Sequence, residues 1–227
     1  FYFFLYIWTI FLGIIFIPFL FLQKEKLYKP AYMWIKGIFF LLKTICDITY
    51  RIKGRANIPD NDTFIIASKH QSAFETLLLF SIFQKAIFIH KYELFFIPIF
   101  GLYLKKISMV AINRLGKSSA LKKMLNDSKK KISNGHSLII FPEGTRKIPG
   151  AKPDYKPGVA GIYKELDYDV LPVALNSGLY WPKNSFAIKP GEIIIEFLPI
   201  IKKGLSKKDF IEKLEKTIEN KTSSLIF

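Results

Sequence analysis

The sequence predicts an α/β domain preceded by two apolar helices. Three observations support this: a charge-free stretch at Phe1–Leu22, a second apolar stretch at Ala31–Tyr50, and short apolar runs that alternate with polar helical segments from Arg51 onward. Such alternation is typical of α/β folds. A chain of 227 residues is long enough for one such domain and hardly for two. We therefore expect membrane-anchoring helices in 1–50 and the α/β domain in 51–227.

The first stretch, Phe1–Leu22, is apolar apart from Thr9, Gly13 and Pro18. A helix that crosses a bilayer core needs about 20 apolar residues, so this stretch is long enough to span the membrane or to embed in it. The basic flank at 23–26 indicates that this end faces the cytoplasm. A secretory signal peptide is the alternative, which the long apolar run and the lack of a small-residue cleavage site disfavour.

The second stretch, Ala31–Tyr50, is apolar except for one polar stripe. Lys36, Lys43 and Asp47 fall on the same side of a helix, because a helix turns once in about 3.6 residues. This pattern is typical of a helix that lies in the membrane interface. A buried core helix is the alternative.

From Arg51 onward, the pattern changes to short apolar runs bounded by turn residues, which are typical of strands. Two polar segments, Gly116–Asn134 and Ser206–Lys221, carry apolar residues at helical spacing and are predicted to be helices. The candidate strands are Thr63–Ser68, Ala86–His90, Ile107–Ile112, Ser137–Phe141, Val170–Leu175 and Glu192–Leu198.

The chain is strongly basic, with a formal net charge of +16. Such a balance indicates an anionic partner: nucleic acid, an anionic membrane surface or a phosphorylated substrate. A hydrophobic anchor and the lack of a recognisable reading module argue against nucleic acid. The single cysteine, Cys46, excludes an internal disulfide framework, and together with three histidines it supplies too few ligands for a structural zinc site.

His70 and Glu75 form the first motif that can carry chemistry. Ser72 with Glu75 matches a capping box that opens a helix, so Glu75 could have a purely structural role. Within one helix, a spacing of five would place His70 and Glu75 about 140° apart. If His70 instead lies in the turn ahead of the helix, the carboxylate can reach back to one ring nitrogen. The other nitrogen is then free to take a proton, as in a catalytic dyad.

The second motif follows the predicted strand Ser137–Phe141. Pro142 and Gly144 indicate a sharp turn at the strand end, where α/β proteins place their active sites. Thr145 supplies a hydroxyl, and Arg146 supplies a guanidinium suited to bidentate contact with phosphate. The alternative is an ordinary polar turn with a solvated arginine.

Four blocks occur in order along the chain: His70–Glu75, Val110–Arg114, Phe141–Arg146 and Val170–Val173. With these blocks the chain resembles the membrane-associated glycerolipid acyltransferases, in particular the bacterial 1-acyl-sn-glycerol-3-phosphate acyltransferases. The third block matches the family without a change. The first block departs from it, since most members carry aspartate where Glu75 stands. The extra methylene still lets the carboxylate meet the imidazole, but it alters the geometry of the pair.

The resemblance implies a mixed β-sheet flanked by helices and a two-helix N-terminal region embedded in the membrane. It also implies transfer of a fatty acyl group from a thioester to the 2-hydroxyl of lysophosphatidic acid, which gives phosphatidic acid. His70 would be the general base and Glu75 would orient it. In the site for the substrate phosphate, Glu143 would organise the turn, and Lys106 fits as well as Lys105. The implied phosphate ligands are Lys105, Arg114, Gly144, Thr145 and Arg146.

The same resemblance implies no metal and no cofactor beyond the acyl donor, which would be acyl-coenzyme A or acyl carrier protein. Membrane lipids are the expected partners, at the cytoplasmic face of the inner membrane. One alternative is acylation of another lysolipid, such as a lyso-ornithine lipid. A non-catalytic, basic protein of the membrane surface is a further alternative, but it leaves His70 and the third block unexplained.

Overall fold

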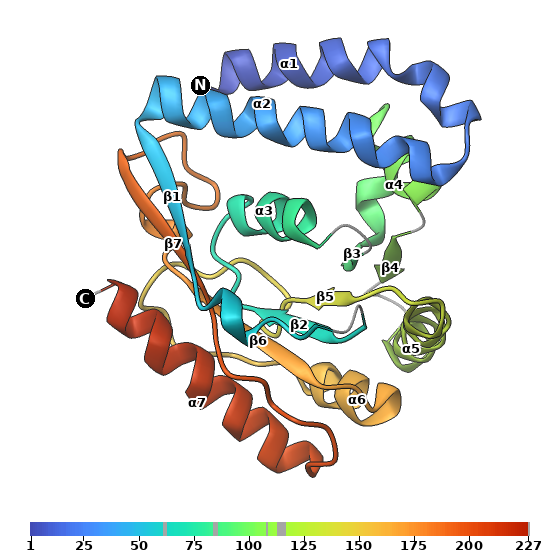
Figure 1. Cartoon of the computed structure of the whole chain (residues 1–227), viewed down its shortest axis with the longest axis vertical. Helices are drawn as coiled ribbons and strands as arrows, with labels where there is room; N and C mark the ends of the chain where they lie inside the picture. Colours follow the sequence, from blue (N-terminus) through green and yellow to red (C-terminus); the bar gives the residue numbers. More distant parts are fainter. Residues whose placement is uncertain (61–62, 84–85, 108, 113–116, 227) are drawn as a thin grey trace.

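A twisted β-sheet lies between two sets of helices in this structure, a computed structural model that describes residues 1–60, 63–83, 86–107, 109–112 and 117–226 (Figure 1). The strands are ordered β1-β7-β6-β2-β5-β3-β4. β6 and β7 pair antiparallel, whereas the other neighbours pair parallel, so the sheet is mixed, as predicted. The strands are β1 (Ile48–Lys53), β2 (Ile65–Ser68), β3 (Ile87–Lys91), β4 (Val110–Ile112), β5 (Leu138–Ile140), β6 (Val170–Leu175) and β7 (Gly191–Phe197).

The helices lie on both faces of the sheet. In Figure 1, α3 lies between the sheet and α2, α1 lies outside α2, and α5, α6 and α7 lie on the other side. The α-helices are α1 (Tyr2–Ile15), α2 (Tyr28–Cys46), α3 (Phe74–Ile82), α4 (Phe100–Ile107), α5 (Lys117–Ser133), α6 (Pro157–Leu166) and α7 (Lys207–Ile226). Short 3-10 helices are η1 (Ile17–Phe21), η2 (Lys24–Leu27), η3 (Arg55–Asn57), η4 (Tyr92–Phe96) and η6 (Ser177–Leu179).

Two hydrophobic cores form because alternate residues of a strand point to opposite faces of the sheet. Ile66 faces the core shared with α2 and α3, while its neighbours Ile65 and Ala67 face the core shared with α5, α6 and α7. Burial on both faces explains why the central strands appear in the sequence as uninterrupted apolar runs.

Helices α1 and α2 pack closely around Gly37. A side chain there would collide with the Trp8 ring, because an added Cβ would lie 2.2 Å from the ring atoms. The Trp8 indole donates to the Trp34 carbonyl oxygen (3.0 Å), and the Trp34 indole donates to the Thr9 hydroxyl (2.9 Å). The predicted pair of N-terminal helices is therefore present as a tightly packed antiparallel hairpin.

The bounds of this hairpin differ from the expectation. α1 ends at Ile15 rather than continuing through Leu22, and the following residues form a 3-10 helix that contains Pro18. Proline has no backbone N–H and disfavours a continuing α-helix. Among the described residues, no helix has the length and apolar character needed to cross a bilayer.

The predicted second helix, Ala31–Tyr50, also needs correction. α2 ends at Cys46, because Asp47 adopts a left-handed conformation with φ of 52°. The chain then enters β1, which was not among the candidate strands. In addition, Ile107 ends α4 rather than beginning a strand, and α4 and α6 were not predicted.

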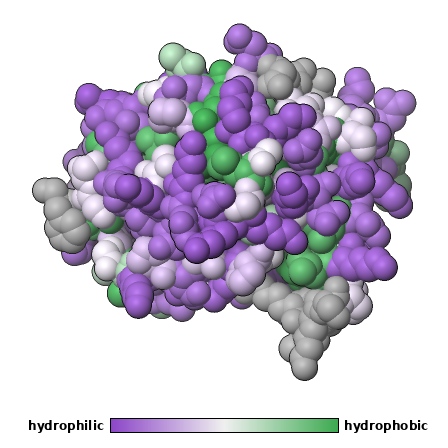
Figure 2. Space-filling view, turned by 90° about the horizontal axis from the view of Figure 1, so that it is seen from below, coloured by the Kyte–Doolittle hydropathy of each residue, from purple (hydrophilic) through white to green (hydrophobic). Residues whose placement is uncertain are grey.

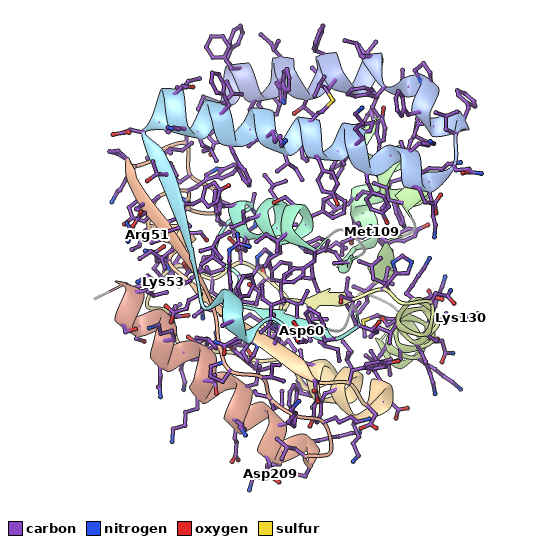
Figure 3. All side chains as sticks on the ribbon, viewed as in Figure 1. Arg51, Lys53, Asp60, Met109, Lys130 and Asp209 are labelled. Atoms are coloured by element: carbon purple, nitrogen blue, oxygen red, sulfur yellow. The ribbon has the colours of Figure 1, made fainter. Side chains whose placement is uncertain are left out.

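The two sides of the molecule differ in polarity. Side chains of α1 point away from the body of the protein in Figure 3, and Phe3, Phe11 and Phe21 are among the exposed apolar residues there. The opposite side, seen from below in Figure 2, is mostly hydrophilic with small apolar areas.

Candidate active site

Three neighbouring parallel strands end at the same edge of the sheet and carry the candidate site. Ala67 of β2 lies beside Ile140 of β5, and Ser68 of β2 lies beside Val173 of β6. The carboxyl ends of adjacent parallel strands bring the segments that follow them into contact. Here those segments are 69–73, 141–150 and 176–189, which are far apart in the chain.

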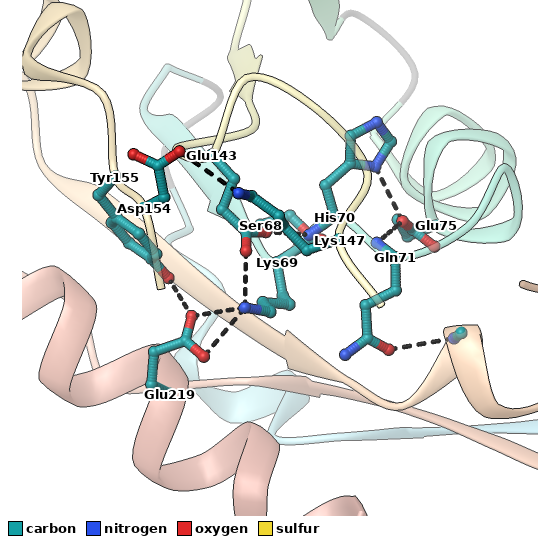
Figure 4. Close-up of polar contacts among 11 residues, drawn as sticks. Ser68, Lys69, His70, Gln71, Glu75, Glu143, Lys147, Asp154, Tyr155 and Glu219 are labelled. Atoms are coloured by element: carbon teal, nitrogen blue, oxygen red, sulfur yellow. Dashed lines mark hydrogen bonds and ion pairs between the residues drawn. The ribbon is translucent and has the colours of Figure 1, made fainter. Parts of the chain in front are cut away.

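His70 lies in the turn between β2 and α3, not within the helix. Its Nδ1 is 2.9 Å from Oε1 of Glu75 in the first turn of α3 (Figure 4). The carboxylate is fully buried and the imidazole side chain is 16% exposed. Because a carboxylate only accepts, this contact requires the ring hydrogen on Nδ1, which leaves a lone pair on Nε2 of the neutral ring.

Glu75 also holds the turn that leads into α3, whose N-cap residue is Ala73. Its Oε1 accepts from the backbone N–H groups of Gln71 and Ser72, both at 2.7 Å, and its Oε2 accepts from the Ser177 hydroxyl at 2.7 Å. The Ser72 hydroxyl in turn accepts from the N–H of Phe74 (3.2 Å). One carboxylate therefore organises the turn ahead of α3 and positions the His70 ring. Of the predicted capping box, the contact from the Ser72 N–H to Glu75 is present, but the N-cap residue is Ala73 rather than Ser72.

The segment after β5 packs directly on His70. The Phe141 ring stacks on the imidazole, with 3.8 Å between centroids and 15° between planes. The N–H of Lys147 donates to the His70 carbonyl oxygen at 2.8 Å. Gly144 has a φ of 64°, a conformation that glycine adopts without the steric cost of a side chain. The two sequence motifs thus meet in one place.

A buried charge cluster lies beneath this turn. The ammonium of Lys69, which is 2% exposed, donates to Glu143 Oε1 at 2.7 Å and to both carboxylate oxygens of Glu219 at 2.8 and 2.9 Å (Figure 4). Glu143 Oε2 accepts from the N–H of His70 at 3.2 Å. Burial raises the pKa of the Glu143 carboxyl, and its hydrogen bond from Lys69 opposes that rise.

The outer part of this cluster belongs to α7 and to the segment before α6. The Tyr155 hydroxyl donates to Oε1 of Glu219 at 2.9 Å. Burial, together with the negative charge of Glu219, raises the pKa of Tyr155. The C-terminal helix is therefore connected, through Glu219, Lys69 and Glu143, to the backbone of His70.

The predicted phosphate ligands that the structure describes do not all lie in the turn after β5. Thr145 Oγ1 accepts from the Lys183 ammonium at 3.3 Å, and Arg146 is partly exposed. Lys105 lies on α4, exposed, with its ammonium 5.6 Å from the centre of the Phe95 ring. Arg114 lies outside the described residues. The roles of these residues, and of Lys106, in holding phosphate stay predictions.

Glu143 was predicted to organise the turn that holds the phosphate. The structure places its fully buried carboxylate between Lys69 and the backbone of His70. Its participation in substrate binding stays a prediction. Within the described residues, no group of three or more His, Cys, Asp or Glu side chains is arranged to hold a metal ion.

Several residues at this site were not predicted. Lys69 immediately precedes His70, but the sequence alone did not indicate that its side chain is buried. The Gln71 side chain accepts from the N–H of Gly178 at 3.0 Å, next to the Ser177 contact with Glu75. Nothing local in the sequence distinguishes Ser177 or Glu219 from other polar residues of a turn or a helix. Lys183 and Tyr155 were not predicted either.

Residues 49–176, more than half of the chain, match the model of the acyltransferase family, and the chain belongs to this family. Among its relatives, a 1-acyl-sn-glycerol-3-phosphate acyltransferase of Pseudomonas aeruginosa is 34% identical over 166 residues, which cover 73% of this chain and 64% of that protein. An enzyme of the same name from Cocos nucifera is 28% identical over 144 residues, covering 63% and 47%. The chain thus spans less than two thirds of the length of these curated relatives.

A solved structure shows the same fold. The crystal structure of the 1-acyl-sn-glycerophosphate (LPA) acyltransferase PlsC from Thermotoga maritima aligns with a TM-score of 0.75 at 23% identity. The alignment covers 97% of this chain and 95% of the other. The alignment therefore includes both the α1–α2 hairpin and the sheet.

Proposed function

We propose that this protein transfers a fatty acyl group from an acyl thioester to the 2-hydroxyl of 1-acyl-sn-glycerol-3-phosphate, forming phosphatidic acid. The observation that carries the proposal is the contact between His70 Nδ1 and Glu75, next to the turn of the third motif. The names of the relatives supply the reaction and the acceptor. The geometry supplies a base beside a turn suited to phosphate.

His70 acts as the general base in this mechanism. Its Nε2 takes the proton of the 2-hydroxyl while the hydroxyl oxygen attacks the thioester carbonyl carbon. The new C–O bond forms, the C–S bond breaks, and the proton passes from the imidazolium to the departing thiolate. General-base assistance of this kind contributes about 10²–10⁴-fold to the rate. Glu75 stabilises the imidazolium, because its carboxylate contacts the protonated Nδ1.

Direct transfer is favoured over an acyl-enzyme intermediate. The Ser72 hydroxyl belongs to the first motif, but it is fully buried and accepts from the Phe74 N–H at the start of α3. No strand–Gly-x-Ser-x-Gly–helix elbow surrounds it. The substrate hydroxyl is therefore the nucleophile that His70 serves.

The substrate phosphate binds at the turn after β5 in this proposal. Gly144 allows the backbone to approach the ligand closely, Thr145 offers a hydroxyl, and Arg146 offers a guanidinium. Arg114 and Lys105 complete the proposed set. The acyl donor is a thioester of coenzyme A or of acyl carrier protein, and the reaction needs no metal or further cofactor.

We also place the α1–α2 hairpin in the membrane interface, on the cytoplasmic face of the inner membrane. Phe21 is 85% exposed, Phe3 69% and Phe40 64%, and such an apolar surface is suited to the lipid boundary. Flotation with vesicles of anionic phospholipid tests this placement. A chain that remains at the bottom of the gradient with the vesicles present contradicts it.

His70→Ala tests the mechanism in detergent-purified protein. We expect kcat/KM for lysophosphatidic acid to fall by about 10²–10⁴-fold, because the base is removed. His90→Ala is the matched control, since His90 lies on β3 and contacts the Lys91 carbonyl oxygen rather than an acid. An active, folded His70→Ala protein would refute the mechanism. Product from another lysolipid, with none from lysophosphatidic acid, would refute the choice of acceptor.

A further inference from the structure

A second cation lies at the turn that carries the third motif. The Lys183 ammonium donates to Thr145 Oγ1 at 3.3 Å, although the two residues are 38 positions apart. Lys183 lies in the segment that follows β6, and this segment contains no recognised sequence motif. We infer that Lys183 is a phosphate-binding residue that sets the preference for a phosphorylated acceptor, an inference that rests on the proposed function.

The segment that carries Lys183 is fastened to the catalytic pair. At its beginning, the Ser177 hydroxyl donates to Glu75 Oε2 at 2.7 Å, and the Gly178 N–H donates to the Gln71 side chain at 3.0 Å. Gly178 also packs on the loop after the third motif, since a Cβ added there would lie 3.0 Å from a Pro149 side-chain atom. The segment that carries Lys183 is therefore anchored at its start beside the catalytic pair.

The other end of the segment contacts the α1–α2 hairpin. The N–H of Lys189 donates to the Tyr180 carbonyl oxygen at 2.9 Å, which closes a loop around Lys183. The Tyr2 hydroxyl of α1 donates to the Ser185 carbonyl oxygen at 2.9 Å. Lys183 thus belongs to a loop that joins the exposed apolar hairpin to the turn, where the headgroup of a membrane lipid would arrive.

The charge of Lys183 is available to a ligand. Lys69 is neutralised by Glu143 and Glu219, and Lys147 is paired with Asp154 at 3.3 Å. Within the described part of the chain, neither Lys183 nor Arg146 has a carboxylate within ion-pair distance. These two cations can therefore attract an anion, whereas Lys69 is compensated by two carboxylates and Lys147 shares the single carboxylate of Asp154 with Lys156.

The spacing also suits one phosphate group. Charge-assisted N–H···O contacts are about 2.7–2.9 Å long, so an ammonium and a hydroxyl 3.3 Å apart can both reach the oxygens of one phosphate. On binding, the contact between Lys183 and Thr145 would be replaced by contacts from both groups to the ligand. A neutral acceptor, such as monoacylglycerol, would gain nothing from the ammonium.

Lys183→Met and Lys183→Arg test the assignment in the purified full chain. With lysophosphatidic acid, we expect Lys183→Met to raise KM by about tenfold or more with kcat changed less than about threefold, because a hydrogen bond to a charged group is lost. Lys183→Arg, which keeps the charge, should restore most of the affinity. Lys189→Met is the matched control on the same loop. Any turnover of monoacylglycerol should not respond to Lys183→Met.

Equilibrium binding of labelled lysophosphatidic acid in detergent micelles, without acyl donor, separates this inference from the proposed function. If the wild type binds the lipid and Lys183→Met binds it about tenfold more weakly, the assignment of Lys183 as a phosphate-binding residue is supported. If the wild type then forms no phosphatidic acid in the activity assay, the proposed function fails without contradicting that assignment. Binding by Lys183→Met within about twofold of the wild type, or no binding by the wild type, overturns the assignment. An equal loss for lysophosphatidic acid and monoacylglycerol overturns it as well.

Discussion

Replacing Lys69 by methionine removes the ammonium from a buried cluster that contains two carboxylates. Methionine has a similar length and fills the same space, so the main change is electrostatic. Lys69 contacts Glu143 at 2.7 Å and Glu219 at 2.8 Å. Without it, Glu143 remains fully buried and keeps the His70 N–H as a donor to its carboxylate.

The expected loss of stability follows from these distances. At an effective dielectric constant of about 20, each contact near 2.7 Å contributes about 6 kcal/mol of Coulomb attraction. Desolvation of the ions offsets much of it, and removing one partner of a buried pair costs about 3–5 kcal/mol. A domain is stable by only about 5–15 kcal/mol. For a chain of this length, we expect Tm to fall by roughly 6–20 °C.

The loss should depend on pH. Burial raises the pKa of Glu143 above its ordinary value of 4.5, and Lys69 opposes that rise, so in Lys69→Met the pKa lies higher still. A carboxyl whose pKa is raised in the folded state stabilises the fold below its unfolded pKa and loses that contribution as pH rises through the folded value. The deficit of Lys69→Met should therefore be larger at pH 8 than at pH 5.

Thermal unfolding followed by circular dichroism at both pH values measures this effect. Adding Glu143→Gln to Lys69→Met should recover part of the loss, because one uncompensated carboxylate is removed. Lys156→Met is the matched control: it breaks the exposed pair with Asp154 and should leave Tm nearly unchanged. Unfolding of Lys69→Met within about 2 °C of the wild type at pH 8, or a larger deficit at pH 5, contradicts the stabilising role of the Lys69 ammonium.

Two further predictions concern the same edge of the sheet. Ser177→Ala removes a buried hydrogen bond to Glu75, so we expect kcat to fall by about tenfold with little change in KM, and steady-state kinetics showing an unchanged kcat would contradict the role of Ser177. Gly144→Ala places a side chain at a φ of 64°, which costs about 1–2 kcal/mol and should lower Tm by roughly 2–8 °C in differential scanning fluorimetry. Gly161→Ala on α6, where an added Cβ meets no atom within 4 Å, is its control and should not lower Tm.

Apolar pattern alone was sufficient to predict the central strands. β6 is buried along its whole length and matches the predicted Val170–Leu175. β1 was missed for the opposite reason: it is an edge strand in which Ile48 is buried, Ile52 is half-buried and the other residues are exposed. Its identity depends on pairing with β7, from which it is separated by most of the chain.

The α1–α2 hairpin shows a similar division. Its apolar composition predicted two N-terminal helices, and both are present. Their ends depended on backbone conformation at particular residues, namely the left-handed Asp47 and the 3-10 helix around Pro18. Hydrophobicity cannot report such local geometry, so the predicted bounds were too long.

By itself, the sequence determined the α/β class and the two motifs, because these depend on local patterns of residues. It offered the pairing of His70 with Glu75 as one of two alternatives, and the structure shows the contact. The tertiary structure alone decided what surrounds them. Glu219 reaches Lys69 across 150 positions, Ser177 reaches Glu75 across 102, and Lys183 reaches Thr145 across 38. These contacts form only in the folded chain, because they join the segments that follow neighbouring strands to one another and to α7, and no local pattern of residues encodes which of them will meet.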